Sequence, residues 1–177
     1  MEQGSNRGAE QSSADVVSAG DVAFLERLRQ SGISVNREGA FIHEGEPVVH
    51  EGLRRALFRW MDRLADGRYA LRLDEKRFAY LDVVDTPLVA NGARLFDDGF
   101  LLASSDGSEE RLDPRTLTVD DAGIFRCWVR GGVLEARLGT SAATVVAERI
   151  AVAKGVVTFR SDGQTFVVGA RRQSASP

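Results

Sequence analysis

The sequence contains one cysteine, Cys127, and two histidines, His43 and His50, among its 177 residues. A single cysteine cannot form an internal disulfide, so we expect the chain to fold in a reducing compartment, the cytoplasm. A zinc site needs three or four cysteine, histidine or carboxylate ligands at defined spacing. The two histidines lie seven residues apart, on different expected elements. We therefore expect no metal and no cofactor.

Long apolar runs, an excess of basic charge and catalytic motifs are absent too. No apolar run approaches the roughly 20 residues that span a bilayer, and no apolar stretch after Met1 resembles a secretory signal. The formal net charge of −3 argues against a nucleic-acid-binding module, which usually has a basic face. Neither a phosphate-binding glycine motif nor the Gly-x-Ser-x-Gly nucleophile motif occurs. We therefore expect neither a membrane nor a nucleic acid as a partner. The absence of catalytic motifs favours a non-enzymatic function.

The proportions of hydrophobic and charged residues are those of an ordinary globular protein. Hydrophobic residues make up 43% of the chain, enough to bury a core without disulfides or metals. Eighteen glycines and only four prolines indicate many turns between short strands. Two segments, 33–84 and 124–168, repeat the order hairpin, helix, hairpin. The pattern predicts an α+β fold of two repeated hairpin–helix–hairpin units, with mainly antiparallel, curled sheets and short helices.

The two predicted helices follow from apolar spacing. In the first unit the residues that share one helical face are Leu53, Leu57, Met61 and Leu64. In the second, Thr140 or Ser141 is the expected N-cap, and the apolar set is Ala142, Val145, Val146 and Ile150. A further short helix is expected after Asp21, in front of the first unit.

These patterns divide the chain into five parts. Residues 1–18 are rich in Ser, Gln and Gly without periodicity and are expected to be disordered. Residues 19–90 form the first repeat with its leading helix, 91–122 a connecting β segment, and 123–170 the second repeat. Residues 171–177 are expected to be a disordered tail.

Several weak motifs, in order, resemble the bacterial DUF1285 family of unknown function. The stretches that carry the resemblance are Gly39 to Pro47, Asp66 to Tyr69, Asp85 to Leu88, Val129 to Gly131 and Ser161 to Gly163. It covers about Ile33 to Gly169. The family tends to have tryptophan where Phe41 stands and arginine where His50 stands. The resemblance implies an α+β fold of duplicated motifs and suggests ligand binding or signalling, without an established enzyme activity.

The best surface for an anion is the basic side of the first predicted helix. Arginines at 54, 55, 59 and 63 follow His50 there, although such a stripe is usually only a solvated face. On the strand after Gly123, Arg126, Trp128 and Arg130 alternate, as in a base-stacking platform or a sheet face covered by long side chains. The predicted ligand-binding residues are His43, His50, Arg54, Trp128 and Arg130.

Three functions remain open. The leading hypothesis is a non-enzymatic module that binds an acidic small molecule or a protein partner between the two repeats, as a monomer or homodimer, with a signalling role. The alternative is a hydrolase-type enzyme with His43 or His50 as acid–base group beside Asp82 or Asp85, at about 3 Å. The third is a structural subunit that exposes Trp60 or Trp128 to a partner.

Overall fold

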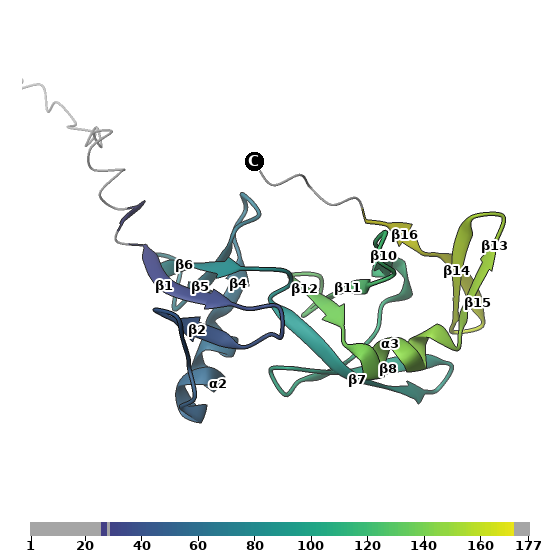
Figure 1. The fold of residues 1–177 in the computed structure, drawn as a ribbon, viewed down its shortest axis with the longest axis horizontal. Helices are drawn as coiled ribbons and strands as arrows, with labels where there is room; N and C mark the ends of the chain where they lie inside the picture. The colour runs from purple at the N-terminus through teal and green to yellow at the C-terminus, as the bar shows by residue number, and fades with distance from the viewer. Residues whose placement is uncertain (1–25, 28, 172–177) are drawn as a thin grey trace, which may run out of the picture.

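The computed structural model describes residues 26–27 and 29–171, which contain two main mixed sheets, a smaller sheet and two short α-helices (Figure 1). This confirms the predicted α+β class. The six-stranded sheet lies at one end of the molecule and the three-stranded sheet at the other, with the seven-stranded sheet between them. The predicted helix after Asp21 lies largely outside the described residues, as do the segments 1–18 and 172–177.

The six-stranded sheet is built from the first third of the chain. Its strands are β1 (Gln30–Val35), β2 (Phe41–His43), β3 (Glu46–Pro47), β4 (Met61–Arg63), β5 (Tyr69–Arg72) and β6 (Phe78–Val83). They lie in the order β3-β2-β1-β6-β5-β4, and α2 (Glu51–Trp60) connects β3 to β4. Strand β6 returns parallel to β1, and the other neighbours are antiparallel.

The remaining strands form the other two sheets. The seven-stranded sheet contains β7 (Leu88–Phe96), β8 (Gly99–Ser104), β9 (Glu109–Arg111), β10 (Thr118–Val119), β11 (Phe125–Val129), β12 (Leu134–Leu138) and β16 (Gly169–Ala170), in the order β16-β10-β11-β12-β7-β8-β9. A 3-10 turn, η1 (Pro114–Thr116), precedes β10. Helix α3 (Thr140–Ala147) leads into the small sheet of β13 (Ile150–Ala153), β14 (Val156–Ser161) and β15 (Gln164–Val167).

The same connectivity occurs twice. Three strands, a helix and three strands run from β1 to β6 and again from β10 to β15, which continues into β16. In the first segment the last of these strands, β6, lies parallel to β1; in the second the additional strand β16, rather than β15, lies parallel to β10.

The turn after the first strand is also the same in both segments. In one, the side-chain oxygen of Asn36 accepts from the backbone N–H of Ala40 at 2.8 Å; in the other, Asp120 accepts from Ile124 at 2.9 Å. Gly39 and Gly123 occupy equivalent positions at φ of 82° and 77°. These values lie in the left-handed region that glycine adopts without steric cost.

Most strand pairings are antiparallel, as the sequence predicts, but both main sheets are mixed and the sheets are not curled. Three of the strand pairings are parallel, and the sheets are open. The edge strands β3 and β4 of the six-stranded sheet do not pair, so that sheet does not close. In the pairs β1–β6 and β10–β16 the chain crosses over through a connection that includes a helix, and in the pair β7–β12 through the strands β8 to β11.

Both predicted helices end earlier than expected. The chain leaves α2 at Met61, which has an extended backbone (ψ 125°), and Met61–Arg63 pairs with β5. Met61 is 4% exposed, so the apolar spacing that suggested a longer helix instead reflects a buried strand residue. Ile150, predicted to be helical, begins β13. The N-cap of α3 is Gly139, without a side-chain hydrogen bond, rather than Thr140 or Ser141.

One hydrophobic core runs through both main sheets. Its most deeply buried large side chains include Val35, Phe41, Leu57, Leu88, Leu102, Leu134 and Phe159. Phe58 on α2 packs edge-on against Phe41, with ring centroids 4.7 Å apart, and this contact fixes α2 on its sheet. Within the described part of the chain, no helix is long and apolar enough to cross a membrane.

Candidate functional site

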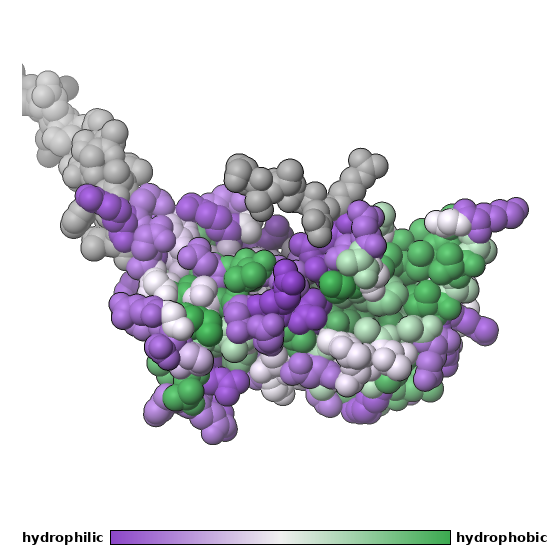
Figure 2. Space-filling view, viewed as in Figure 1, coloured by the Kyte–Doolittle hydropathy of each residue, from purple (hydrophilic) through white to green (hydrophobic). Residues whose placement is uncertain are grey.

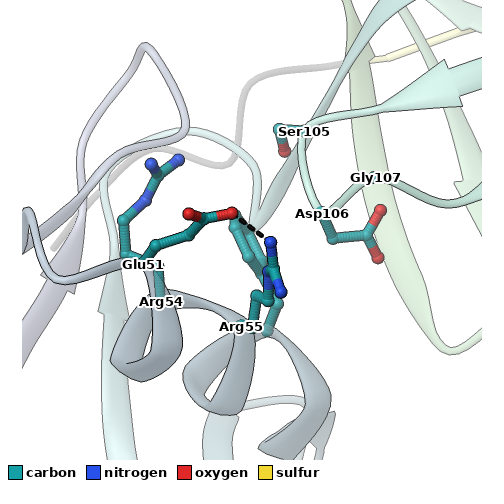
Figure 3. Close-up of a pocket in the computed structure, with 7 residues that line it drawn as sticks. Glu51, Arg54, Arg55, Ser105, Asp106 and Gly107 are labelled. Atoms are coloured by element: carbon teal, nitrogen blue, oxygen red, sulfur yellow. Dashed lines mark hydrogen bonds and ion pairs between the residues drawn. The ribbon is translucent and has the colours of Figure 1, made fainter.

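A hollow of about 290 Å³ lies between α2 and the turn that joins β8 to β9 (Figure 3). Its lining residues are Glu51, Arg54, Arg55 and Phe58 of the helix and Ser105, Asp106 and Gly107 of the turn. The two walls are about fifty residues apart in the sequence, so the hollow exists only in the folded chain. Among the residues predicted to bind a ligand, Arg54 lines it.

The position of α2 determines which side chains face the hollow. Nδ1 of His50 accepts a hydrogen bond from the backbone N–H of Leu53 at 3.1 Å and so caps the helix. Leu57 and Phe58 are buried, which leaves Arg54 and Arg55 exposed on the outer side. His50, predicted as a ligand contact, therefore has a structural role at the start of this helix.

The two arginines of the hollow differ in their partners. Arg55 forms an ion pair with Glu51, one helical turn earlier. Arg54 forms no ion pair and no side-chain hydrogen bond with any residue that the structure describes. In Figure 3 its guanidinium rises beside the Glu51 carboxylate, away from Asp106. Arg54 is therefore the cation at this hollow that is available to a ligand.

The opposite wall is held by Arg130, a second predicted ligand contact. Its guanidinium binds Asp106 Oδ2 at 2.5 Å and the backbone carbonyl oxygen of Phe58 at 2.8 Å. Its backbone N–H donates to the Glu110 carboxylate at 2.8 and 2.9 Å. Arg130 thus joins the C-terminal end of α2 to the β8–β9 turn, and its guanidinium is already bonded.

Asp106 supplies a negative charge to the same wall. Burial by itself would raise the pKa of Asp106, but hydrogen bonds from Ser108 and Arg130 outweigh it and lower the pKa overall. The carboxylate therefore stays ionised at neutral pH. The hollow thus has the guanidinium of Arg54, unpaired within the described residues, on the helix side, whereas the Asp106 carboxylate on the turn side is already bonded to Ser108 and Arg130.

Trp128 and His43 lie elsewhere. Trp128 is half-buried on β11, with the Arg63 guanidinium 4.8 Å from the ring centroid, and it lines a separate hollow of about 340 Å³. His43 is exposed at the end of β2. Arg126, expected beside Trp128 on a stacking face, is buried in ion pairs. Of the predicted residues, Arg54 therefore lines the hollow, and Arg130 bonds to two of its wall residues without lining it. His50 caps the same helix, and His43 and Trp128 lie elsewhere.

The histidine–aspartate arrangement of the alternative hypothesis does not occur in the described structure. Asp82 is exposed on β6, and Asp85 pairs with Arg126 at 2.8 Å and Arg137 at 3.2 Å. No hydrogen bond or ion pair in residues 26–27 and 29–171 joins a histidine to either aspartate. Cys127 is 1% exposed, and burial raises the pKa of its thiol to about 12, so it is not a nucleophile at neutral pH.

No group of three or more potential metal ligands occurs within the described residues. The large exposed apolar residues are not the tryptophans, since Trp60 and Trp128 are both half-buried. Three of them, Val152, Val156 and Val167, lie on β13–β15, where Figure 2 shows hydrophobic residues gathered at one end of the molecule.

The structure contains a buried ionic cluster that no sequence pattern predicted. Asp85, Asp120, Arg126 and Arg137 lie together, and Arg126 and Asp120 are each 7% exposed. Asp85 and Arg126 are 41 residues apart, so no local pattern predicts their contact. The only available signal was the match of the Asn36–Gly39 and Asp120–Gly123 turns, which places Asp120 at an equivalent position in the second segment.

Together these features define an α+β protein of two similarly connected segments with an arginine-bearing hollow beside its first helix. No family model matches the sequence, and no curated protein matches it either. Among solved structures, a DUF1285 family protein from Silicibacter pomeroyi DSS-3 is similar, with a TM-score of 0.66 and 17% identity over 79% of this chain and 80% of that one. A DUF1285 family protein from Shewanella baltica OS155 gives a TM-score of 0.52 and 17% identity over 62% of this chain and 84% of that one.

The fold is therefore that of the DUF1285 structures, which confirms at the level of the fold the resemblance carried by the sequence motifs. At 17% identity, only the fold can be inferred from these structures. Any function must be argued from the residues of this chain.

Proposed function

We propose that this protein is a non-enzymatic module that binds an acidic small molecule in the hollow between α2 and the β8–β9 turn. The observation that carries the proposal is the contrast between Arg54 and its neighbours. Arg55 and Arg130 are bonded to carboxylates, whereas Arg54 has no ion pair within the described residues. A guanidinium at the edge of a concave surface is suited to binding a carboxylate or phosphate through two parallel hydrogen bonds.

The charges of the hollow also restrict the ligand. Glu51 and Asp106 oppose a compound with several negative charges. A ligand with a single acidic group at Arg54 fits this balance of charge. Arg55 can contribute as well, because an exposed ion pair one helical turn apart is weak and can exchange its carboxylate for a ligand.

Binding rather than catalysis fits the groups near the hollow. Its lining contains no histidine and no cysteine. A cytoplasmic protein that binds a metabolite without converting it would be suited to signalling. On this proposal, a protein partner distinguishes the ligand-bound form of the protein from the ligand-free form.

A thermal-shift screen of the full chain against organic acids, amino acids and sugar phosphates tests the proposal. A ligand that binds only the native state raises Tm by mass action, by an amount equivalent to about 2.7 kcal/mol at a hundred times its Kd. Arg54→Ala should abolish the shift. Arg59→Ala is the matched control, since Arg59 is also exposed on α2 but does not line the hollow. No shift with any compound, or equal shifts in the two variants, would contradict the proposal.

A further inference from the structure

A second cavity, of about 230 Å³, lies where the two equivalent turns come together. Its lining combines Arg37 of the first turn, residues Asp120, Ala122 and Ile124 of the second, and the charged side chains of Asp85, Arg126 and Arg137. None of these residues lines the hollow beside α2. The cavity is therefore a separate site, formed by both segments of the chain.

Arg126 is the central residue of this cavity. Its Nη1 donates to Asp120 at 2.5 Å and its Nη2 to Asp85 at 2.8 Å. Its Nε–H has no acceptor among the residues that the structure describes, although Arg126 is only 7% exposed. A buried N–H without an acceptor costs free energy, and such groups in folded proteins are usually satisfied by water or by a ligand.

Arg137 presents a second unsatisfied N–H. Its Nη2 donates to the backbone carbonyl oxygen of Arg37 at 2.8 Å. Its Nε lies 3.2 Å from Asp85 Oδ2 without forming a hydrogen bond. Two guanidinium groups at one cavity thus each have a buried Nε–H that forms no hydrogen bond within the described residues.

The charge of the lining favours an anion. It contains three guanidinium groups and two carboxylates, which leaves one positive charge uncompensated. The Arg37 guanidinium is exposed and takes part in none of the ion pairs found in the described part of the chain. A water molecule would satisfy an N–H, but it would not balance this charge.

We infer that this cavity binds one small oxyanion, the carboxylate or phosphate group of a ligand or the free ion. The anion accepts hydrogen bonds from the Nε–H groups of Arg126 and Arg137 and pairs with the guanidinium of Arg37. Because Arg37 belongs to the first segment and Arg126 to the second, the bound anion links the two segments.

NMR of the arginine Nε–H groups of the full-length protein tests this inference. Sodium acetate and sodium phosphate are titrated separately, with sodium chloride holding the ionic strength constant. The assigned Nε–H signals of Arg126 and Arg137 should shift and saturate with at least one anion. Arg37→Ala should weaken that binding about tenfold, the loss expected for one charge-assisted hydrogen bond. This variant keeps the backbone carbonyl that Arg137 binds.

Arg115→Ala is the control, because Arg115 is exposed, pairs with Asp113 and lies outside this lining. Saturation with acetate alone identifies a carboxylate ligand, with phosphate alone a phosphoryl ligand, and with both a general oxyanion site. No saturation beyond the effect of chloride would show that the cavity holds only water and would overturn the inference. Equal affinity in Arg37→Ala and the wild type would overturn it too. Arg54→Ala should leave this binding unchanged, so the two proposed sites are tested independently of each other.

Discussion

At the scale of single residues, the most consequential feature is the buried cluster around Arg126. Taking charged groups out of water is costly unless each finds a partner of opposite charge. Asp120 meets that need for Arg126 and also accepts from the backbone N–H groups of Ala122 and Ile124. One carboxylate thus holds both the turn and the buried guanidinium, and its removal leaves two arginines, the buried Arg126 and the half-buried Arg137, with Asp85 as their shared carboxylate.

We therefore expect Asp120→Ala to lower the free energy of unfolding by about 3–5 kcal/mol, the usual cost of removing one partner from a buried ion pair. Urea denaturation measures the change. The control is Asp121→Ala, which removes an exposed carboxylate from the next position of the same turn. Equal, small losses in both variants would show that the cluster contributes little to stability.

The carboxylate of Asp106, whose side chain is 3% exposed, predicts a pH dependence of stability. Its pKa is lowered in the folded state, because hydrogen bonds from Ser108 and Arg130 outweigh the effect of burial. The stabilisation is therefore fully present above the unfolded value of about 3.9 and is lost as pH falls through the lower folded value. The stability difference between wild type and Asp106→Asn should be largest near neutral pH and shrink below about pH 4. A difference that stays constant across this range would contradict the assignment.

At the scale of elements, the turns and caps matter most. The two equivalent turns place glycine at nearly the same φ, but their surroundings differ. A Cβ added to Gly39 would meet Val89 Cγ2 at 3.0 Å, whereas one added to Gly123 would meet nothing within 4 Å. The pair separates the cost of backbone strain from the cost of steric contact.

Gly123→Ala should lower the free energy of unfolding by about 1 kcal/mol, because alanine is strained at positive φ and nothing else is disturbed. Gly39→Ala should lower the free energy of unfolding by more, because the Val89 side chain must also move. Chemical denaturation of the two variants gives both values. A larger loss at Gly123 than at Gly39 would contradict the described packing of the first turn.

Helix α2 carries Arg54, so its cap affects the candidate site. His50→Ala removes the acceptor for the Leu53 N–H and should cost about 1 kcal/mol, whereas His50→Asn should retain the cap. His43→Ala is the control, because His43 is exposed and forms no side-chain hydrogen bond in the described structure. Equal effects at the two histidines in thermal unfolding would argue against the cap.

At the scale of the whole molecule, sequence patterns predicted the local hairpins but not the long-range strand pairings. Alternating strands and glycine turns gave the α+β class and the hairpins of β5–β6, β11–β12 and β14–β15. The parallel returns of β6 and β16 were missed, because their partners lie about fifty residues away and no local residue marks them. The end of α2 was missed because Met61 is apolar in either a helix or a buried strand.

The candidate site was predictable to a similar extent. The stripe of arginines identified Arg54, since exposed helical positions can be assigned from spacing alone. That Arg130 would bond to Asp106 and Phe58 rather than to a ligand depends on contacts 24 and 72 residues away. The ionic cluster at Asp85 and Arg126 likewise depends on a pairing 41 residues apart.

The most direct test of the central claim is a backbone amide NMR titration of the full chain with the best acidic ligand from the screen. The account predicts saturable shifts in two places, the helix around Arg54 and the turn Ser105–Gly107, and their loss in Arg54→Ala but not in Arg59→Ala. Shifts confined to other surfaces, or identical shifts in both variants, would show that the hollow beside α2 is not the binding site.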